Sequence, residues 1–232
     1  MSYIFFWKTD EEYGFLSNWY HSPFIVDGIE YYHTEQYFMA KKASFFGDLV
    51  HQKEILASSS PKKCKDLGCL VSPFDPVVWD EFRYGIMMNA NLAKFTQNHE
   101  LRKKLLDTGD SLLAEASPVD GIWGIKLSAD EAAKLPPEEW PGLNLMGKIL
   151  MTLRSDFRSD IFKLTGKTDH QLKIEWLKQV ERNFGIINLR EHERLLNSIE
   201  KSDSGGKEII CKRNFSRSYR VNRKKGKEDK VV

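Results

Sequence analysis

The pattern of apolar residues changes near residue 200, and this change limits how much of the chain can fold. Residues 201–232 contain eleven Lys or Arg against four Asp or Glu, begin with the Ser- and Gly-rich run Ser202–Gly206, and show no apolar periodicity. Such a segment cannot bury enough apolar surface to fold by itself, so we expect a disordered basic tail. The tail carries a net charge of +7, which leaves −5 for residues 1–200.

The preceding residues divide again at the run Thr165–Thr168. Residues 1–158 make up a unit of ordinary domain size, and here we expect a packed core. Residues 159–200 contain two amphipathic segments, Gln171–Phe184 and Leu189–Ile199, which predict a helical extension in the form of a helical hairpin. The expected organisation is therefore one folded domain, a helical extension and the basic tail.

Composition indicates where the chain resides and which groups it lacks. No run of eighteen apolar residues occurs, so we expect neither a signal peptide nor a membrane span. Cys64, Cys69 and Cys211 form no C-x-x-C pair, which predicts reduced thiols in the cytoplasm or the nucleus. No side chains have the spacing of a metal-ligand cluster, so we expect no metal and no other cofactor.

The apolar periodicity of the first 158 residues predicts a helix-dominated α+β domain with short β elements. Strands are expected at Tyr3–Trp7 and Leu112–Ala116, and a hairpin at Phe24–Tyr32 around an Asp-Gly turn. Thr34 is the expected N-cap of the first helix and Gly47 its stop. The expected helices are Thr34–Phe46, Leu49–Ala57, Ser60–Gly68, Asp75–Phe95, His99–Leu106 and Asn144–Phe157.

The segment His33–Lys42 carries the first candidate site. Glu35 and Lys42 are seven residues apart, so on a helix they share one face, with Phe38 between them. A carboxylate near the start of a helix and beside aromatic rings can serve as general acid or base. The alternative is an exposed Glu35 that complements the helix dipole, together with a solvated Lys42.

Three further places combine rings with polar groups. In the loop Phe15–Trp19, Ser17 and Asn18 could hold a ribose hydroxyl beside a stacked base, or they could simply cap a turn. Trp79 lies on a predicted helix, at a position more typical of a core than of a ligand platform. The loop Asp120–Gly124 joins a carboxylate and a large ring to glycines that permit close backbone approach.

Together these pieces resemble the YbiA-like NADAR family over Ile4–Arg158. The matching motifs are an F-x-S-N loop at Phe15–Asn18, an S/T-E-x-Y-F helix start at Thr34–Phe38 with Lys42, Trp79, a D-x-x-W-G loop at Asp120–Gly124 and an N-x-x-G helix at Asn144–Gly147. The resemblance implies an α+β domain that hydrolyses N-glycosidic bonds. One branch of the family is linked to removing ADP-ribose from guanine bases in nucleic acid, and another to cleaving phosphorylated intermediates of riboflavin biosynthesis.

By position, the resemblance makes Glu35 the central catalytic carboxylate and implicates Asp120 and Trp79 in activity. The predicted catalytic residues are Glu35, Asp120 and Lys42, and the predicted substrate-binding residues are Phe15, Ser17, Asn18, Tyr37, Trp79, Trp123, Gly124 and Asn144. The chain departs from several bacterial members at Ile125–Leu127 and in the insertion Ser128–Gly142. This departure bears on the choice of substrate more than on the reaction.

Cleavage of a ribose C1–N bond develops positive charge on the sugar, so the site needs anionic groups and a positioned water. We expect Glu35 to manage the water or the proton of the leaving nitrogen, and Asp120 to hold ribose hydroxyls or stabilise the charge. Trp79 or Trp123 would stack on a ring or exclude water. Lys42 could contact a phosphate or form a Schiff base with the opened sugar.

We expect the substrate to be an ADP-ribosylated nucleic acid or nucleoside, since the basic tail could follow a phosphate backbone while Phe215 and Tyr219 stack on bases. The tail could instead be a nuclear-localisation or solubilising segment. The alternative functions are an N-glycosidase of riboflavin intermediates and a non-catalytic ADP-ribose-binding module. The two carboxylates, Glu35 and Asp120, favour an enzyme. A helical adaptor is a further possibility for the extension, and no feature predicts an oligomeric state.

Overall fold

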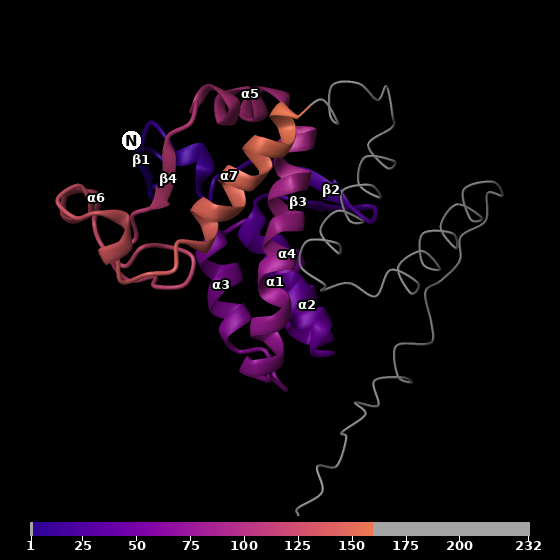
Figure 1. Ribbon diagram of the computed structural model, residues 1–232. Helices are drawn as coiled ribbons and strands as arrows, with labels where there is room; N and C mark the ends of the chain where they lie inside the picture. The colour runs from indigo at the N-terminus through magenta and orange to yellow at the C-terminus, as the bar shows by residue number, and fades with distance from the viewer. Residues whose placement is uncertain (1, 160–232) are drawn as a thin grey trace, which may run out of the picture. The chain divides into compact units, whose positions relative to one another are not determined.

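The computed structural model describes residues 2–159 of the chain. The predicted basic tail and the predicted helical extension after its first residue, Ser159, lie outside this range. Within it, seven α-helices accompany two small two-stranded sheets, so the predicted helix-dominated α+β class is confirmed (Figure 1). No helix in the same range is long and apolar enough to cross a membrane.

The predicted hairpin is confirmed. Strand β2 (Phe24–Val26) pairs antiparallel with β3 (Ile29–Tyr31), and two residues connect them. These residues, Asp27 and Gly28, have φ angles of 54° and 74°. Positive φ at both central positions is the geometry of a type I′ turn, whose twist matches that of the strands and which Asp-Gly favours. The local sequence is therefore enough to form this element.

The second sheet joins distant parts of the chain. Strand β1 (Tyr3–Phe6) lies parallel to β4 (Leu112–Glu115), and Phe6 is the register partner of Glu115. Parallel neighbours need a long connection between them, and here that connection contains five of the seven helices of the described chain. Both strands were expected, whereas their pairing is new information. The pairing fixes the place where β4 ends.

The described chain contains the six helices predicted within it and one more, α6, that was not predicted. They are α1 (Thr34–Phe45), α2 (Leu49–Leu56), α3 (Pro61–Cys69), α4 (Pro76–Gln97), α5 (His99–Asp107), α6 (Ala129–Ala132) and α7 (Leu145–Arg158), with short 3₁₀ turns at Gly14–Leu16 and Pro137–Glu139. Side chains of Asp48, Ser60 and Asp75 accept backbone N–H groups at the starts of α2, α3 and α4. Such caps satisfy N–H groups that have no partner within a helix.

The N-cap of α1 differs from the prediction, because it is His33 and not Thr34. Nδ1 of His33 accepts the backbone N–H of Gln36 at 3.0 Å, while Nε2 donates to the carbonyl of Ser59 at 3.2 Å. Burial lowers the pKa of His33 to about 4, so near neutral pH the ring is uncharged and its Nδ1 can accept. The Thr34 hydroxyl is used in a tertiary contact instead.

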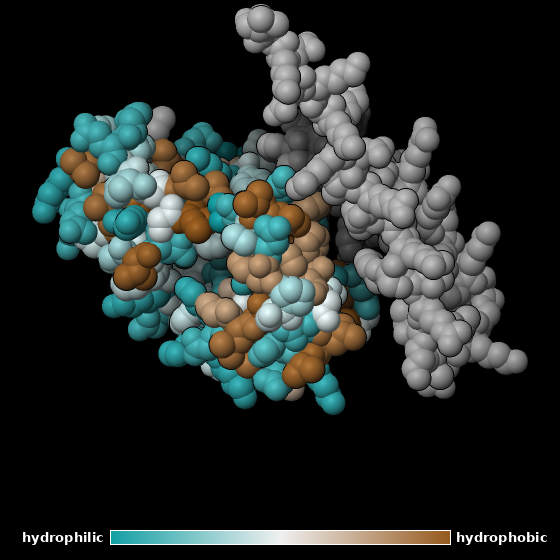
Figure 2. Space-filling model, turned by 90° about the horizontal axis from the view of Figure 1, so that it is seen from below, coloured by the Kyte–Doolittle hydropathy of each residue, from teal (hydrophilic) through white to brown (hydrophobic). Residues whose placement is uncertain are grey.

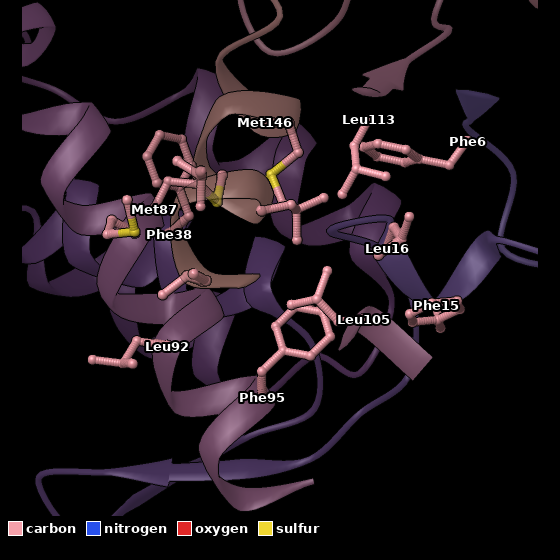
Figure 3. Close-up of a cluster of buried hydrophobic side chains, with 14 of the residues drawn as sticks. Phe6, Phe15, Leu16, Phe38, Met87, Leu92, Phe95, Leu105, Leu113 and Met146 are labelled. Atoms are coloured by element: carbon pink, nitrogen blue, oxygen red, sulfur yellow. The ribbon is translucent and has the colours of Figure 1, made fainter. Parts of the chain in front are cut away.

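The main apolar core lies between α1, α4, α7 and the β1–β4 pair. Figure 3 shows Met146 of α7 between Met87 and Phe38 on one side and Leu113 and Phe6 on the other. All five side chains are at most 4% exposed. A second cluster packs the hairpin and α2 against the other face of α1; its members are Phe24, Val26, Tyr31, Tyr37, Ala40, Ala43, Ile55, Cys64, Val71 and Ala90. Helix α1 therefore lies between two cores.

The carboxyl end of α1 adjoins an apolar part of the surface. Phe45, Leu49, Val50, Phe74 and Val77 each keep at least 41% of their surface exposed. Figure 2, which views the described residues from below, shows apolar side chains distributed among polar ones. The candidate carboxylate Glu35 lies in the first turn at the opposite end of α1. The two ends of this helix therefore differ in chemistry.

Candidate active site

The first turn of α1 is attached to the loop that precedes the hairpin. The backbone N–H of Glu35 donates to the carbonyl of Asn18 at 3.1 Å. The Thr34 hydroxyl is 3.0 Å from both the carbonyl and Oδ1 of Asn18. Glu35 itself is only 6% exposed, so it is not the solvated first-turn carboxylate of the alternative interpretation. Asn18 thus positions the residue that carries the candidate carboxylate.

The buried Lys94 binds the backbone of the same loop. Nζ of Lys94, on α4, donates to the carbonyls of Phe15 at 2.7 Å and Ser17 at 3.0 Å. Lys94 has no exposed surface, and burial lowers its pKa to about 7. Phe15 packs in the main core, and the Ser17 hydroxyl accepts the backbone N–H of Trp19 at 3.3 Å. Within this loop, Phe15 and Ser17 therefore have supporting roles: one packs in the core and the other binds the backbone of Trp19.

A second carboxylate, Glu115, lies at the end of β4, and α7 fixes its backbone. Asn144, just before α7, accepts the N–H of Glu115 through Oδ1 at 3.2 Å and donates from Nδ2 to the carbonyl of Leu113 at 2.9 Å. A Cβ at Gly147 would collide with that carbonyl and with the Asn144 side chain. Asn144 and Gly147 therefore let α7 contact β4 directly, which explains the N-x-x-G spacing.

A third carboxylate, Asp120, lies in the loop after β4. Its Oδ1 accepts the backbone N–H groups of Ile122 and Trp123, both at 2.8 Å. Gly124 brings this loop against the strand, because a Cβ there would be 2.7 Å from the carbonyl oxygen of Glu115. The D-x-x-W-G motif is thus a tight turn that presents Asp120 near the end of β4.

Backbone hydrogen bonds also close the base of the insertion. Gly142 N donates to Ile125 O at 2.9 Å, and Asn144 N donates to Gly124 O at 3.1 Å. The insertion Ser128–Gly142 therefore leaves the domain and returns to it at neighbouring points. It contains α6, which begins with a capping box between Ser128 and Glu131, and the second 3₁₀ turn.

The three carboxyl groups of Glu35, Glu115 and Asp120, which we call the carboxylate cluster, interact electrostatically. Burial raises the pKa of Glu35 to about 7, and the charge of Asp120 raises it too, against the opposing effects of Lys65 and a hydrogen bond from the Trp19 side chain. Burial raises the pKa of Glu115 to about 8, with further increases from Asp120 and Glu35 and a decrease from Lys65. Such shifts are typical of sites that exchange protons near neutral pH.

Aromatic rings line the side of the cluster formed by α1 and the Asp120 loop. The Phe38 ring centroid lies 5.1 Å from that of Trp79 and 5.3 Å from that of Trp123, which meets it edge-on. Trp79 is 6% exposed and packs in the main core. Trp123 is half-buried, and the more exposed Trp19 lies at the rim with Lys65 above its ring. Of the three indoles near the cluster, Trp19 and Trp123 are thus more accessible to solvent than Trp79.

Comparison with known proteins places this arrangement in a family. The family model of the NADAR domain matches residues 5–158. The chain belongs to the NADAR domain family. An N-glycosidase of Acanthamoeba polyphaga mimivirus is 47% identical to it over 127 residues, which cover 55% of this chain and 75% of that protein. A riboflavin biosynthesis protein of Vibrio vulnificus is 30% identical over 155 residues, or 67% of this chain and 38% of that protein.

A solved structure supports the same fold. The NMR structure of the Escherichia coli protein YbiA is similar to this NADAR domain with a TM-score of 0.59 and 32% sequence identity, covering 73% of this chain and 91% of that one. The predicted membership of the YbiA-like NADAR family is therefore confirmed. Most of the motif residues that carried the prediction lie at the carboxylate cluster or in the elements that support it.

Two predicted site residues of this NADAR domain are placed elsewhere. Nζ of Lys42 donates to the carbonyl of Gly68 at 2.8 Å and lies 4.0 Å from the centroid of the Phe74 ring. The cation that acts on Glu35 and Glu115 is Lys65 of α3. Tyr37 is turned by about 200° from Glu35 around the helix and packs in the second core. The structure does not bring either group to the carboxylate cluster, and their roles stay predictions.

Two groups at the site, Glu115 and Lys65, were missed from the sequence, whereas Trp19 belongs to the predicted candidate loop Phe15–Trp19. Glu115 has the clearest signal, because it is a lone carboxylate in an otherwise apolar segment, Leu112–Ala116, that was predicted to be a strand. Lys65 has no such signal, since it reaches the site through the packing of α3 on α1. Among residues 2–159, no group of three or more His, Cys, Asp or Glu side chains is placed to hold a metal ion.

Proposed function

We propose that this NADAR domain is a hydrolase that cleaves N-glycosidic bonds, and that its substrate is an ADP-ribosylated guanine base in nucleic acid or in a nucleoside. The observation that carries the proposal is the convergence of Glu35, Glu115 and Asp120, two of them with a pKa near neutrality, beside Trp123. The name of the mimiviral relative, an N-glycosidase, supports the reaction class.

The mechanism follows from the charges. As the C1–N bond of the ribose breaks, positive charge develops on the sugar, and ionised carboxylates nearby stabilise it. Glu35 takes a proton from the attacking water, because its raised pKa makes it a usable base near pH 7. Asp120 uses Oδ1 to order its own loop, and we assign its Oδ2 to the ribose hydroxyls.

Features around the cluster support a nucleotide substrate. Trp19 is 37% exposed and can stack on a base, and the exposed Lys65 beside it can neutralise a phosphate. The basic segment 201–232 supports a polyanionic substrate, since a net charge of +7 attracts a phosphate backbone. The relative named as a riboflavin biosynthesis protein supports a second candidate, an N-glycosidase acting on phosphorylated intermediates of that pathway.

The test offers both substrates to the full-length chain. One is a guanine-containing oligonucleotide with ADP-ribose on the base, and the other is a phosphorylated ribosylamine intermediate of riboflavin synthesis. We expect release of ADP-ribose from the first, and a loss of about 10²- to 10⁴-fold in turnover for Glu35→Gln. Glu81→Gln, an exposed glutamate of α4, is the matched control and should retain full turnover.

Each outcome has a clear meaning. Cleavage of the riboflavin intermediate alone would replace the proposed substrate and keep the reaction class. Tight binding of ADP-ribose without turnover of either glycoside would indicate a binding module and overturn the proposal of a hydrolase. Equal turnover by Glu35→Gln and the wild type would remove Glu35 from the mechanism.

A further inference from the structure

We propose that Glu115 is the proton donor to the leaving nitrogen and that it forms an acid–base pair with Glu35. The inference deepens the proposed function, because it assigns the second half of the same reaction. The sequence analysis assigned no role to Glu115, and it enters through its position in the fold.

The fold fixes the backbone of Glu115 on three sides. The residue lies opposite Phe6 in the parallel strand pair. Its N–H donates to Oδ1 of Asn144 at 3.2 Å, and its carbonyl accepts the N–H of Ile125 at 2.9 Å. Gly124 contacts the same carbonyl closely. These contacts fix the point from which the side chain projects, which favours a group that must meet one atom of a substrate.

The side chain itself has an unmatched polar atom. Oε2 of Glu115 is enclosed and has no hydrogen-bond partner within the described residues. Buried polar side-chain atoms normally have a partner, so a carboxylate that serves only to support the fold would be hydrogen-bonded. An ionised carboxylate without a donor is costly to bury, and protonation removes most of that cost. The environment therefore favours the neutral acid.

Glu35 has the opposite surroundings. It lies in the first turn of α1, where the helix dipole stabilises negative charge, and it receives a hydrogen bond from the Trp19 side chain. The charged groups that act on both glutamates are Asp120 from the loop after β4 and Lys65 from α3. Between the two glutamates, the proton therefore resides on Glu115 and the negative charge on Glu35. Burial raises the pKa of both carboxyl groups, so the pair can hold a proton near neutral pH.

The step balances with one water. The C1–N bond of the glycoside breaks, its electron pair stays on the nitrogen, and that nitrogen takes the proton of Glu115. Water oxygen forms the new bond to C1 and gives its proton to Glu35. Glu35 is then neutral and Glu115 ionised, and transfer of one proton from Glu35 to Glu115 through solvent restores the starting state. No oxidant, reductant or metal enters the balance.

The first experiment needs no turnover. In full-length protein labelled with ¹³C at the glutamate carboxyl, NMR titration follows the signals assigned by Glu35→Gln and Glu115→Gln. We expect the Glu115 carboxyl to be largely protonated at pH 7 and to titrate at higher pH than that of Glu35. A Glu115 signal that titrates in the ordinary acidic range would overturn the proposal, whether or not the chain hydrolyses the proposed substrate.

The second experiment uses the pH profile of kcat on the ADP-ribosylated oligonucleotide. The wild type should give a bell-shaped profile, whose alkaline limb reports the acid of the pair. Glu115→Gln should lower kcat about 10²- to 10⁴-fold and lose that limb, with KM changed less than kcat. The control Glu139→Gln, at an exposed site in the insertion, should keep the wild-type profile.

A separate variant covers the case in which Glu115→Gln does not fold. Asp120→Asn keeps an oxygen for the two backbone N–H groups of its loop but removes the charge that raises the pKa of Glu115. The alkaline limb of its profile should move to lower pH. An unmoved limb in Asp120→Asn, or a retained limb in Glu115→Gln, would show that another group is the acid. If the wild type cleaves no ADP-ribosylated guanine, the proposed function fails while the titration still decides the state of Glu115.

Discussion

Two regions of this domain bury charged side chains, and they treat them differently. Under the Phe15–Trp19 loop, Lys94 is fully buried, and its ammonium group donates to two backbone carbonyls. In the carboxylate cluster, Glu35 is buried and Glu115 is half-buried, yet the enclosed Oε2 of Glu115 has no partner among the described residues. Burial moves the pKa of each group toward neutrality, to about 7 for both Lys94 and Glu35.

The difference distinguishes a charged group that supports the fold, Lys94, from groups that we expect to take part in the reaction, Glu35 and Glu115. Partners fixed by the backbone compensate the burial of Lys94, so its removal would leave two carbonyls without donors. The two glutamates have fewer hydrogen-bond partners to compensate the loss of water. Binding of a substrate can therefore change their protonation state at a low cost in free energy. We expect variants of Lys94 to change stability and variants of the glutamates to change chemistry.

The largest effect on stability is expected from Lys94→Met, which keeps the length of the side chain and removes its charge. The carbonyls of Phe15 and Ser17 lose their donor, and we expect the free energy of unfolding to fall by about 2 to 4 kcal/mol. Urea unfolding of Lys94→Met measures this loss of stability, and Lys53→Met, at an exposed site on α2, is the control. Equal stabilities would mean that Lys94 is not the support of the loop.

The second prediction concerns the pH dependence of stability. Glu35 and Glu115 have raised pKa values, so between their ordinary 4.5 and about 7 to 8 the native state binds more protons than the unfolded state. The free energy of unfolding should therefore fall as pH rises through this window. Lys94, with a pKa lowered from 10.5 to about 7, gives the opposite slope above pH 7.

Difference curves isolate these contributions from those of other groups. The free energy of unfolding of the wild type minus that of the Glu35→Gln, Glu115→Gln double variant should decline between about pH 5 and 8. The free energy of unfolding of the wild type minus that of Lys94→Met should rise between about pH 7 and 10. Thermal unfolding at a series of pH values provides both curves. Two difference curves whose slopes with pH have the same sign would contradict the contrast between the two regions.

The smallest effect is expected from Lys65→Ala. Lys65 is exposed, so solvent screens its charge, and the loss should change turnover at pH 7 only about two- to fivefold. Because Lys65 lowers the pKa of both glutamates, the acidic limb of the kcat profile should move to higher pH. Lys62→Ala, on the exposed face of the same helix, is the control. An unchanged profile would place Lys65 outside the electrostatics of the cluster.

The sequence allowed prediction of features whose cause is local. The turn at Asp27 and Gly28 and the helix starts at Ser60 and Asp75 depend on residues within three positions of each other, and all are confirmed. Thr34 failed as a cap because its hydroxyl binds Asn18, sixteen residues away. The sequence pattern gave no information about partners brought together only by packing.

The candidate site shows the same limit. Glu35 and Asp120 were named from motifs, and the structure brings their charges together. Glu115 and Lys65 could not be placed, because their proximity depends on the pairing of β1 with β4 and on the packing of α3 against α1. A motif identifies residues along the chain, whereas an electrostatic pair is a property of the fold.

The closed base of the insertion Ser128–Gly142 has an evolutionary consequence. Gly142 and Asn144 return the chain to Ile125 and Gly124 through backbone hydrogen bonds, while Ala132 and Trp140 of the insertion pack with Ala114 and Ala116, the neighbours of Glu115. Selection can therefore vary the exposed positions of this segment, whereas a change at Trp140 would reach the strand that carries Glu115.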